Sequence, residues 1–188
     1  MARADRVIVD IGTGDGRAVL ARARAEPGAL ILGVDASAAA MAESSRRAAR
    51  RGPPNAVFLV EGAEALGLTV LGCRADLITV TFPWGSLLRG VLGLDEAALA
   101  GIAAVVAPGG RVEVLASVVL GDGIEGISTL DACHEPEIRR AWAAAGLELR
   151  SMRPATQGEV AASGSSWARR LDTARAARPV WRLDLCRP

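Results

Sequence analysis

The sequence predicts an α/β fold with a mostly parallel β-sheet and helices on both faces of that sheet. Two observations favour it: short β-branched runs alternate with helical patterns, and a glycine-rich turn joins the first run to the first helix. A third is composition, because 188 residues that are 51% hydrophobic and 23% charged are typical of one soluble domain with a substantial core. We therefore expect residues 1–188 to form a single domain.

The N-terminal elements follow the order strand, turn, helix, strand, helix. The β-branched run Arg6–Ile11 stops at a glycine-rich turn, and Arg17–Ala25 then has the residues of a helix. Ala29–Asp35 is typical of a second, buried strand. Ser37 is a suitable N-cap for an alanine-rich helix that continues to about Arg51, where a Gly-Pro-Pro sequence ends it.

The later elements continue this alternation until two irregular stretches interrupt it. Ser117–Asp131 contains three glycines and is expected to leave the sheet as a mobile loop. Arg153–Pro179 is mostly polar, and a polar segment of this length is usually functional or disordered. Strands are expected at Ala56–Val60, Ala75–Thr81, Arg111–Ala116, Leu147–Met152 and Val180–Cys186, and helices at Leu87–Leu92, Asp95–Val106 and Pro136–Ala145.

The formal charge of +1 hides an asymmetry along the chain. Residues 1–138 have a balance of −5, whereas residues 139–188 carry 10 arginines against four acidic residues, a balance of +6. A basic C-terminal part favours a polyanionic partner, although arginines on a solvated face are the commoner explanation. All the basic residues are arginines, to which we give no functional weight.

Cysteines, histidine and hydropathy exclude several classes of protein. Cys73, Cys133 and Cys186 form no CxxC pair and His134 is the single histidine, so no zinc or other metal site is expected. The N-terminal residues have no signal-peptide pattern, and no apolar stretch is long enough to span a membrane. We expect a cytoplasmic protein with reduced thiols.

The glycine-rich turn predicts a nucleotide-like site. Gly12, Gly14 and Gly16 follow a strand and open a helix, so backbone N–H groups and the helix dipole can face a polar ligand. Asp35 ends the next strand 19 residues after Gly16, the separation typical of a carboxylate that binds both ribose hydroxyls. Together they indicate a cofactor that contains adenosine.

The details of the turn favour S-adenosylmethionine over a dinucleotide. The spacing is GxGxG, and Arg17 occupies the position of the third glycine in the motif of NAD enzymes. Asp10 lies two residues before the first glycine, where an anion suits a cationic sulfonium or an amino group better than a pyrophosphate. For either aspartate alone a structural role is nearly as good an explanation, with Asp10 capping the turn and Asp35 capping the next helix.

Two further segments are expected at the same edge of the sheet, because both follow strands. Ala63 and Glu64 follow the third strand and would border the adenine, while Thr81 and Pro83 follow the fourth and would lie beneath the methyl group. The alternatives are an exposed cap for Glu64 and an ordinary strand end for Thr81.

Two tryptophans lie in sequences that are typical of loops. Trp84 stands between Pro83 and Gly85, and Trp167 follows two serines. Such a pair can hold a flipped base by stacking on both of its faces, although an arbitrary tryptophan more often covers an apolar surface. Trp142 and Trp181 are assigned to the core.

Arginines gather at the end of the alanine-rich helix and in the polar C-terminal stretch. They would form a basic surface for RNA phosphates around the mouth of the site. The alternative for the helical cluster is a solvated helix end whose cations complement the helix dipole. These residues are Arg46, Arg47, Arg50 and Arg51, with Arg169, Arg170, Arg175 and Arg178.

Four sequences in this order, VIVDIGTGDGRA, GVDAS, FPWGSLLRGVLG and SSWARRL, extend over most of the chain from Val7. They resemble the aminoglycoside-resistance 16S rRNA methyltransferases that modify N1 of adenine 1408, the Kam family. The resemblance implies a class I, Rossmann-like fold with a seven-stranded sheet and an enzyme that binds S-adenosylmethionine and releases S-adenosylhomocysteine. It also implies docking on the assembled 30S subunit, by a protein that we expect to be monomeric.

On matching positions the resemblance implies specific roles. Trp84 and Trp167 would hold the flipped adenine, with Thr81 and Pro83 aligning the loop beneath it, and Ser165 would orient the second tryptophan. Arg170, Arg175 and the helical arginines would contact RNA. The cofactor site would be lined by Asp10, Gly12, Gly14, Asp35, Ala63, Glu64, Thr81 and Ser86.

The chain departs from the family in two respects: relatives begin further upstream with an extension that covers one side of the fold, and some of them have lysine where the basic linker here has arginine. Two other functions stay open, one because the cofactor motif is shared among methyltransferases and one because of the extension and the glycine-rich Ser117–Asp131. The first is a methyltransferase for a small molecule, for which charge reversal at Arg170 and Arg175 would leave activity intact. The second is a weakly active or inactive ribosome-binding homologue, which would bind the cofactor without methyl transfer.

Overall fold

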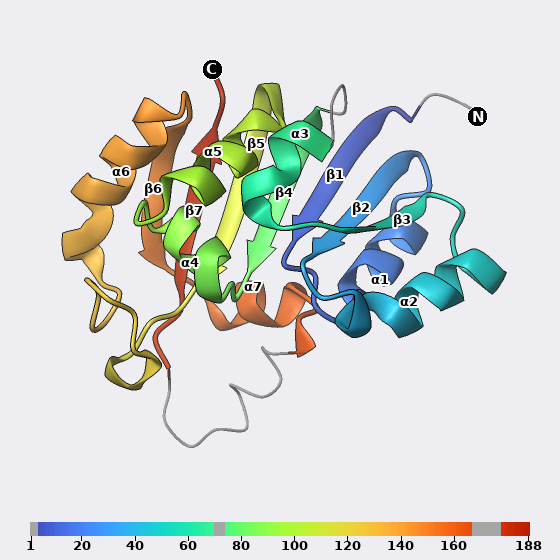
Figure 1. The fold of residues 1–188 in the computed structure, drawn as a ribbon, viewed down its shortest axis with the longest axis horizontal. Helices are drawn as coiled ribbons and strands as arrows, with labels where there is room; N and C mark the ends of the chain where they lie inside the picture. Colours follow the sequence, from blue (N-terminus) through green and yellow to red (C-terminus); the bar gives the residue numbers. More distant parts are fainter. Residues whose placement is uncertain (1–3, 70–73, 167–177) are drawn as a thin grey trace.

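One seven-stranded sheet organises the chain (Figure 1). The computed structural model describes residues 4–69, 74–166 and 178–188. The strand order is β3-β2-β1-β4-β5-β7-β6, and β7 runs antiparallel to both of its neighbours while β1 to β5 are parallel. The strands are β1 (Arg6–Ile11), β2 (Ala29–Asp35), β3 (Ala56–Val60), β4 (Ala75–Thr81), β5 (Val106–Ala116), β6 (Glu148–Pro154) and β7 (Trp181–Cys186).

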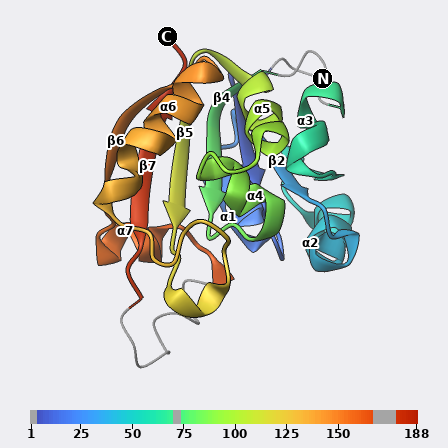
Figure 2. The same ribbon diagram turned by 60° about the vertical axis from the view of Figure 1, so that its left-hand side comes forward.

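Helices lie on both faces of this sheet, and Figures 1 and 2 show α1 and α2 on the face opposite α4, α5 and α6. The short helix α7 lies at the edge where β1 and β4 end (Figure 1). The helices are α1 (Arg17–Ala25), α2 (Ala38–Arg51), α3 (Leu66–Thr69), α4 (Gly85–Val91), α5 (Glu96–Ala104), α6 (Glu135–Ala144) and α7 (Gln157–Ala162), with short 3₁₀ turns η1 (Ala63–Ala65), η2 (Leu120–Asp122) and η3 (Ala132–His134).

Alternating side chains on the strands separate two hydrophobic clusters. On β1, Ile8 joins Val19 and Ala23 of α1, whereas Val9 joins the larger cluster that includes residues of α4, α5 and α6. Successive side chains of a strand point to opposite faces, so both clusters follow from one apolar run. The α1 face differs over β5 and β7, which carry charged side chains there, among them Glu113 and Arg182.

Most expected elements are confirmed, and the differences have physical causes. β5 begins at Val106, five residues before the expected start, and Ala104 ends the preceding helix. Its first part contains a Pro-Gly-Gly sequence, which hid the strand in the sequence because these residues are rare in strand interiors. The pairing shifts register between Ala75 and Leu77, and a Cβ on Gly110 would stand 2.7 Å from the Ala75 carbonyl oxygen.

Ser117–Asp131 leaves the sheet after β5 ends at Ala116 and is irregular apart from η2, as expected, but it is anchored to the core. Val118, Ile127 and Leu130 are buried in the main cluster, so apolar packing holds the segment. Arg178, just before β7, also donates to Ser117 and forms an ion pair with Asp122, whose side chain is only 8% exposed. The glycines hid these anchors, which are spaced too irregularly to form a helix or strand pattern.

The polar stretch Arg153–Pro179 is likewise not a loop throughout. Its first two residues complete β6, and α7 follows, capped by Thr156, whose hydroxyl accepts from the Glu159 N–H at 3.2 Å. Trp142 is fully buried, as expected, but Trp181 is only partly buried. Cys73 lies outside the described residues.

The described part of the chain holds neither a membrane-spanning helix nor a metal-binding cluster. None of its helices combines the length and the apolar character needed to cross a membrane. No three histidine, cysteine or acidic side chains there are grouped so as to hold a metal ion.

Candidate active site

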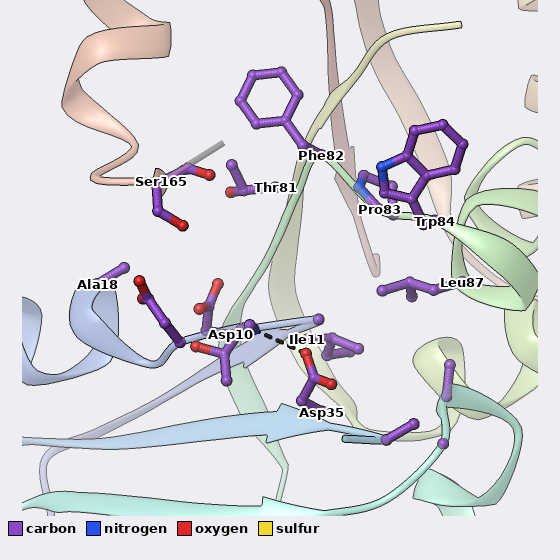
Figure 3. A pocket seen from close by; sticks show the side chains of 18 of the residues that line it. Asp10, Ile11, Ala18, Asp35, Thr81, Phe82, Pro83, Trp84, Leu87 and Ser165 are labelled. Carbon is purple, nitrogen blue, oxygen red and sulfur yellow. Dashed lines mark hydrogen bonds between the residues drawn. The ribbon is translucent and has the colours of Figure 1, made fainter. Parts of the chain in front are cut away.

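A cavity of about 330 Å³ lies where β1, β2 and β4 end, within the range of small-molecule sites. Figure 3 shows the carboxylates of Asp10 and Asp35 on one side of it, with Ser165 and Trp84 across from them. The segments after β1, β2, β3 and β4 all contribute to its lining, as does the segment after α7. This position, at the carboxyl ends of parallel strands, is where open α/β sheets bind ligands.

The glycine-rich turn has a backbone that side chains would obstruct. Gly12, Gly14 and Gly16 have φ angles of 74°, 59° and 69°, a region that residues with a Cβ rarely adopt. A Cβ on Gly12 would stand 2.6 Å from Leu87 Cδ2, and one on Gly16 would stand 2.5 Å from the Phe58 ring. A Cβ on Gly14 would meet nothing within 4 Å. Two glycines therefore allow close packing, and the third keeps the turn open toward the cavity.

Asp35 has a structural role and also lines the cavity. Its Oδ2 accepts a hydrogen bond from Gly14 N at 2.8 Å, and its Oδ1 accepts one from Ser37 N at 2.8 Å. The carboxylate thus links the glycine turn to the start of α2. It also lines the cavity, where the remaining lone pairs of both oxygens are available to a ligand.

Asp10 is a partly buried residue of β1, at the centre of the sheet. Burial raises its pKa above the ordinary value, and a hydrogen bond of 2.7 Å from Thr79 Oγ1 opposes this shift. Thr13 Oγ1 is close enough to help lower this pKa, yet it forms no hydrogen bond of ordinary geometry within the described chain. A partly buried carboxyl beside an unsatisfied hydroxyl is a polar environment that suits a ligand.

The segment after β3 forms another wall. Ala63 is buried and Glu64 is exposed, and both line the cavity together with Glu61 and Gly62. Ala63 and Glu64 therefore line the same cavity as the glycine turn, as expected. Glu61 and Gly62 were not singled out from the sequence, although they stand directly before the expected pair.

The connection from β4 to α4 forms the wall nearest to the exposed surface. Thr81, Pro83, Trp84 and Ser86 line the cavity, and the Trp84 side chain is exposed, at 44% for the residue (Figure 3). Phe82 has a φ of 52° and a buried ring, and it is the only residue other than glycine with a positive φ in the described chain. Such strain often marks a functional segment. No local signal in the sequence indicates it.

The last wall comes from the segment after α7. Ser163, Gly164, Ser165 and Ser166 line the cavity. Of these, only Ser165 was singled out from the sequence, and there its expected role was to orient the second tryptophan. A Cβ on Gly164 would lie 3.7 Å from Ala18 Cβ, so this segment passes close to α1. Trp167, Arg169, Arg170 and Arg175 lie outside the described residues.

The arginines expected to form one basic surface divide into two groups. Arg46, Arg47, Arg50 and Arg51 are all exposed on α2, where Arg46 is paired with Glu43 at 3.1 Å. Arg178 does not belong to such a surface, because its side chain is only 19% exposed and is paired with Asp122. Its sequence position among other arginines gave no indication of this partner.

These features define a class of enzyme. The strand order with one reversed strand, the glycine turn after β1 and the acidic residue at the end of β2 are those of a class I methyltransferase that uses S-adenosylmethionine. A model of the NpmA family, described as 16S rRNA (adenine(1408)-N(1))-methyltransferase, matches residues 1–184. The chain belongs to this family.

Curated relatives and solved structures agree with that assignment. The enzymes of this description from Streptoalloteichus hindustanus and Streptoalloteichus tenebrarius are 36% and 37% identical over 182 residues, which is 91% of this chain and 82% of each relative. Superposition on the crystal structure of the methyltransferase KamB gives a TM-score of 0.86 at 32% identity. The match covers 100% of this chain and 90% of the KamB chain. A variant of the Catenulisporales acidiphilia enzyme, solved with the cosubstrate SAM, has a TM-score of 0.86 at 31% identity, covering 99% of this chain and 87% of its own.

Proposed function

We propose that this protein transfers a methyl group from S-adenosylmethionine to N1 of adenine 1408 of 16S rRNA in the assembled 30S subunit, and so confers aminoglycoside resistance. The observation that carries the proposal is a cavity lined by Asp10 and Asp35 beside the exposed Trp84, in a chain of this family. S-adenosylhomocysteine is the second product. We also propose that residues 1–188 act as one catalytic domain, as a monomer in the cytoplasm.

The residues of the cavity fit S-adenosylmethionine. The unsatisfied Thr13 hydroxyl and the open side of Gly14 leave room and a polar partner for a ligand. Asp35 is placed to bind the ribose hydroxyls, Asp10 to attract the positively charged amino end, and Ala63 and Glu64 to border the adenine. Gly12 and Ser86 complete the lining. When bound, the cofactor supplies an electrophilic methyl group on its sulfonium.

The chain's own residues then position the acceptor. Adenine N1 has a lone pair that can attack a methyl group without a strong base, so orientation dominates the rate. Trp84 offers an exposed ring on which a flipped adenine stacks, and Thr81 and Pro83 shape the cavity beneath it. We assign the second face of the base to Trp167, with Ser165 orienting that tryptophan.

The exposed arginines of α2 supply the contact with RNA in this proposal. Arg47, Arg50 and Arg51 form no ion pair with any described residue, so their charges are available to phosphates. Arg46, despite its pair with Glu43, extends the same cluster. Arg170 and Arg175 add to this surface on the proposed assignment. Binding to the assembled subunit offsets the cost of flipping the base out of its stack.

The test is transfer of labelled methyl from S-adenosylmethionine to purified 30S subunits, with free 16S rRNA as a control and reverse transcription to map the product. We expect label on 30S and a stop at adenine 1408. Trp84→Ala should lower the transfer rate by about 10- to 100-fold, because a stacked base is worth about 1–3 kcal/mol. Trp84→Phe keeps a ring and should retain most activity.

Two results would overturn the proposal. One is cofactor binding by the wild-type protein without methylation of 30S or with methylation at another position. The other is equal transfer rates for wild type and Trp84→Ala, which would exclude the stacking role of this ring.

A further inference from the structure

A second cavity lies next to the first, on the α1 side of the sheet and beside α7. Its volume is about 480 Å³, and Ser163 and Gly164 line both cavities. The segment after α7 therefore has open space on two sides. Neighbouring atoms pack this wall of the cofactor site in part, at Gly164, where a Cβ would lie 3.7 Å from Ala18 Cβ. The contacts made by α7 therefore also bear on its position.

Helix α7, which leads into this segment, has no buried residue. Apolar packing therefore contributes little to its position, in contrast to α1, which buries Val19, Leu20 and Ala23. The side chain that ties α7 to the sheet is Glu159. Arg153 at the end of β6 donates to both of its oxygens, Nη1 to Oε2 at 2.9 Å and Nη2 to Oε1 at 2.5 Å.

Arg182 of β7 forms a second contact between the sheet and Glu159. Its guanidinium lies 3.6 Å from Glu159 Oε1, 3.2 Å from Glu113 Oε2 of β5 and 2.7 Å from Asp184 Oδ1. Hydrogen bonds from Arg153 first, and then from the Thr156 backbone, hold the pKa of Glu159 well below its usual range. Glu159 is therefore ionised at neutral pH and connects α7 to two strands, β6 through Arg153 and β7 through Arg182.

A short series of hydrogen bonds connects Glu159 to the cofactor cavity. Its carbonyl accepts from Ser163 N at 3.1 Å, and Ser163 Oγ donates to the Val160 carbonyl at 2.7 Å. Ser163 Oγ also accepts from Ser165 N at 3.3 Å. A displacement of Glu159 would thus move Ser163 and Ser165, which line the cofactor cavity.

We propose that Glu159 is a positioning residue of the cofactor site: through Arg153 and Arg182 it holds α7 on β6 and β7, and so places the Ser163–Ser166 wall against the bound cofactor. This inference rests on the proposed function in naming S-adenosylmethionine as the ligand. Glu159 itself does not line the cofactor cavity. Its effect is therefore indirect, and we expect it first in cofactor affinity, because the Ser163–Ser166 wall lines the cofactor cavity.

The test compares Glu159→Gln with a matched control, Glu135→Gln. Like Glu159, Glu135 forms an ion pair with an arginine, here Arg139 of the same helix α6, at 2.6 Å. Glu135 does not line the cofactor cavity. We expect Glu159→Gln to raise the Kd for S-adenosylmethionine, measured by calorimetry, about 10-fold, since hydrogen bonds to charged groups are at stake. The control should bind like wild type.

Three readouts separate positioning from a general loss of stability. Glu159→Gln should raise KM for the cofactor while kcat at saturating cofactor stays within about twofold, and its melting temperature should match that of Glu135→Gln. Glu159→Asp should recover part of the affinity. In an Arg153→Met background, Glu159→Gln should have a much smaller effect, because the two residues act through one contact.

An unchanged Kd in Glu159→Gln would overturn the inference, as would equal effects of Glu159→Gln and Glu135→Gln. A lower kcat at unchanged KM would overturn it as well. The proposed function fails separately, if wild type binds the cofactor but does not methylate 30S, and the comparison of Kd values then still decides the role of Glu159.

Discussion

Two walls of the cofactor cavity are held in place by different forces. The glycine-turn wall is part of the backbone network, since the N–H groups of Gly12 and Thr13 both donate to the Val34 carbonyl, at 2.8 and 3.0 Å. The α7 wall depends on the Glu159 carboxylate, 23% exposed, and the Arg153 side chain, 44% exposed. One wall is set by steric and backbone geometry, the other by charges that water and salt can weaken.

The difference separates two requirements of a methyltransferase site. The glycine turn must fit one cofactor closely, and a backbone that tolerates no Cβ provides that fit. The α7 wall lines the cofactor cavity and continues in sequence into the residues that we propose for RNA and base contact. We infer that the site combines one wall formed by folding with one wall that is positioned by ion pairs. Each prediction below tests this contrast.

The largest effect is expected in the glycine wall. Gly12→Ala combines a φ of 74° with a Cβ 2.6 Å from Leu87 Cδ2, whereas Gly14→Ala has a φ of 59° and no close neighbour. Backbone strain alone costs about 1–3 kcal/mol, so we expect Gly12→Ala to weaken S-adenosylmethionine binding about 100-fold. Gly14→Ala should lose about 10-fold. Calorimetry measures both, and equal affinities would contradict the packing argument.

A smaller effect is expected when Asp10 is replaced. The replacement should raise the stability of the fold and weaken cofactor binding. Burial raises its pKa in the folded state, so the folded protein loses stability as the pH rises through that pKa. Asp10→Asn removes this loss and keeps the oxygen that accepts from Thr79. We expect a melting temperature a few degrees higher at pH 7 and cofactor affinity about 10-fold weaker.

The gain in melting temperature should shrink as the pH is lowered toward the ordinary value of 3.8, because the wild-type carboxyl is then protonated. Thermal melts of both proteins at several pH values between about pH 4 and about pH 8 check this. A lower melting temperature for Asp10→Asn across the range would show that the carboxylate stabilises the fold.

The smallest effect should come from salt. Exposed ion pairs are screened over a Debye length of about 10 Å at 0.1 M ionic strength, so raising the salt should weaken cofactor binding by about two- to threefold through the α7 wall. Glu159→Gln should lose most of this dependence, while Gly14→Ala should keep it. Calorimetric titrations at several salt concentrations would contradict the contrast if all three proteins responded equally.

Much of the fold and half of the site could be predicted from local patterns. Short apolar runs, the N-cap Ser37 and the glycine turn identified most elements, since each depends on residues close in sequence. Asp35 was found because its spacing from the turn is set by one helix and one strand. The anchors of Ser117–Asp131 could not be found, because Val118 and Leu130 pack against distant elements. The strain at Phe82 has no signal in the residues around it.

The sequence by itself determined the order in which strands and helices follow one another along the chain. It also determined the glycine turn with its two aspartates and the family to which the chain belongs. These are consequences of local periodicity and of short motifs. Only the tertiary structure decided that Arg178 is paired with Asp122, that α7 has no buried residue and that Glu159 meets arginines of two strands. The physical reason is that an ion pair depends on distance in space, and a charged residue carries no mark of its partner in the chain.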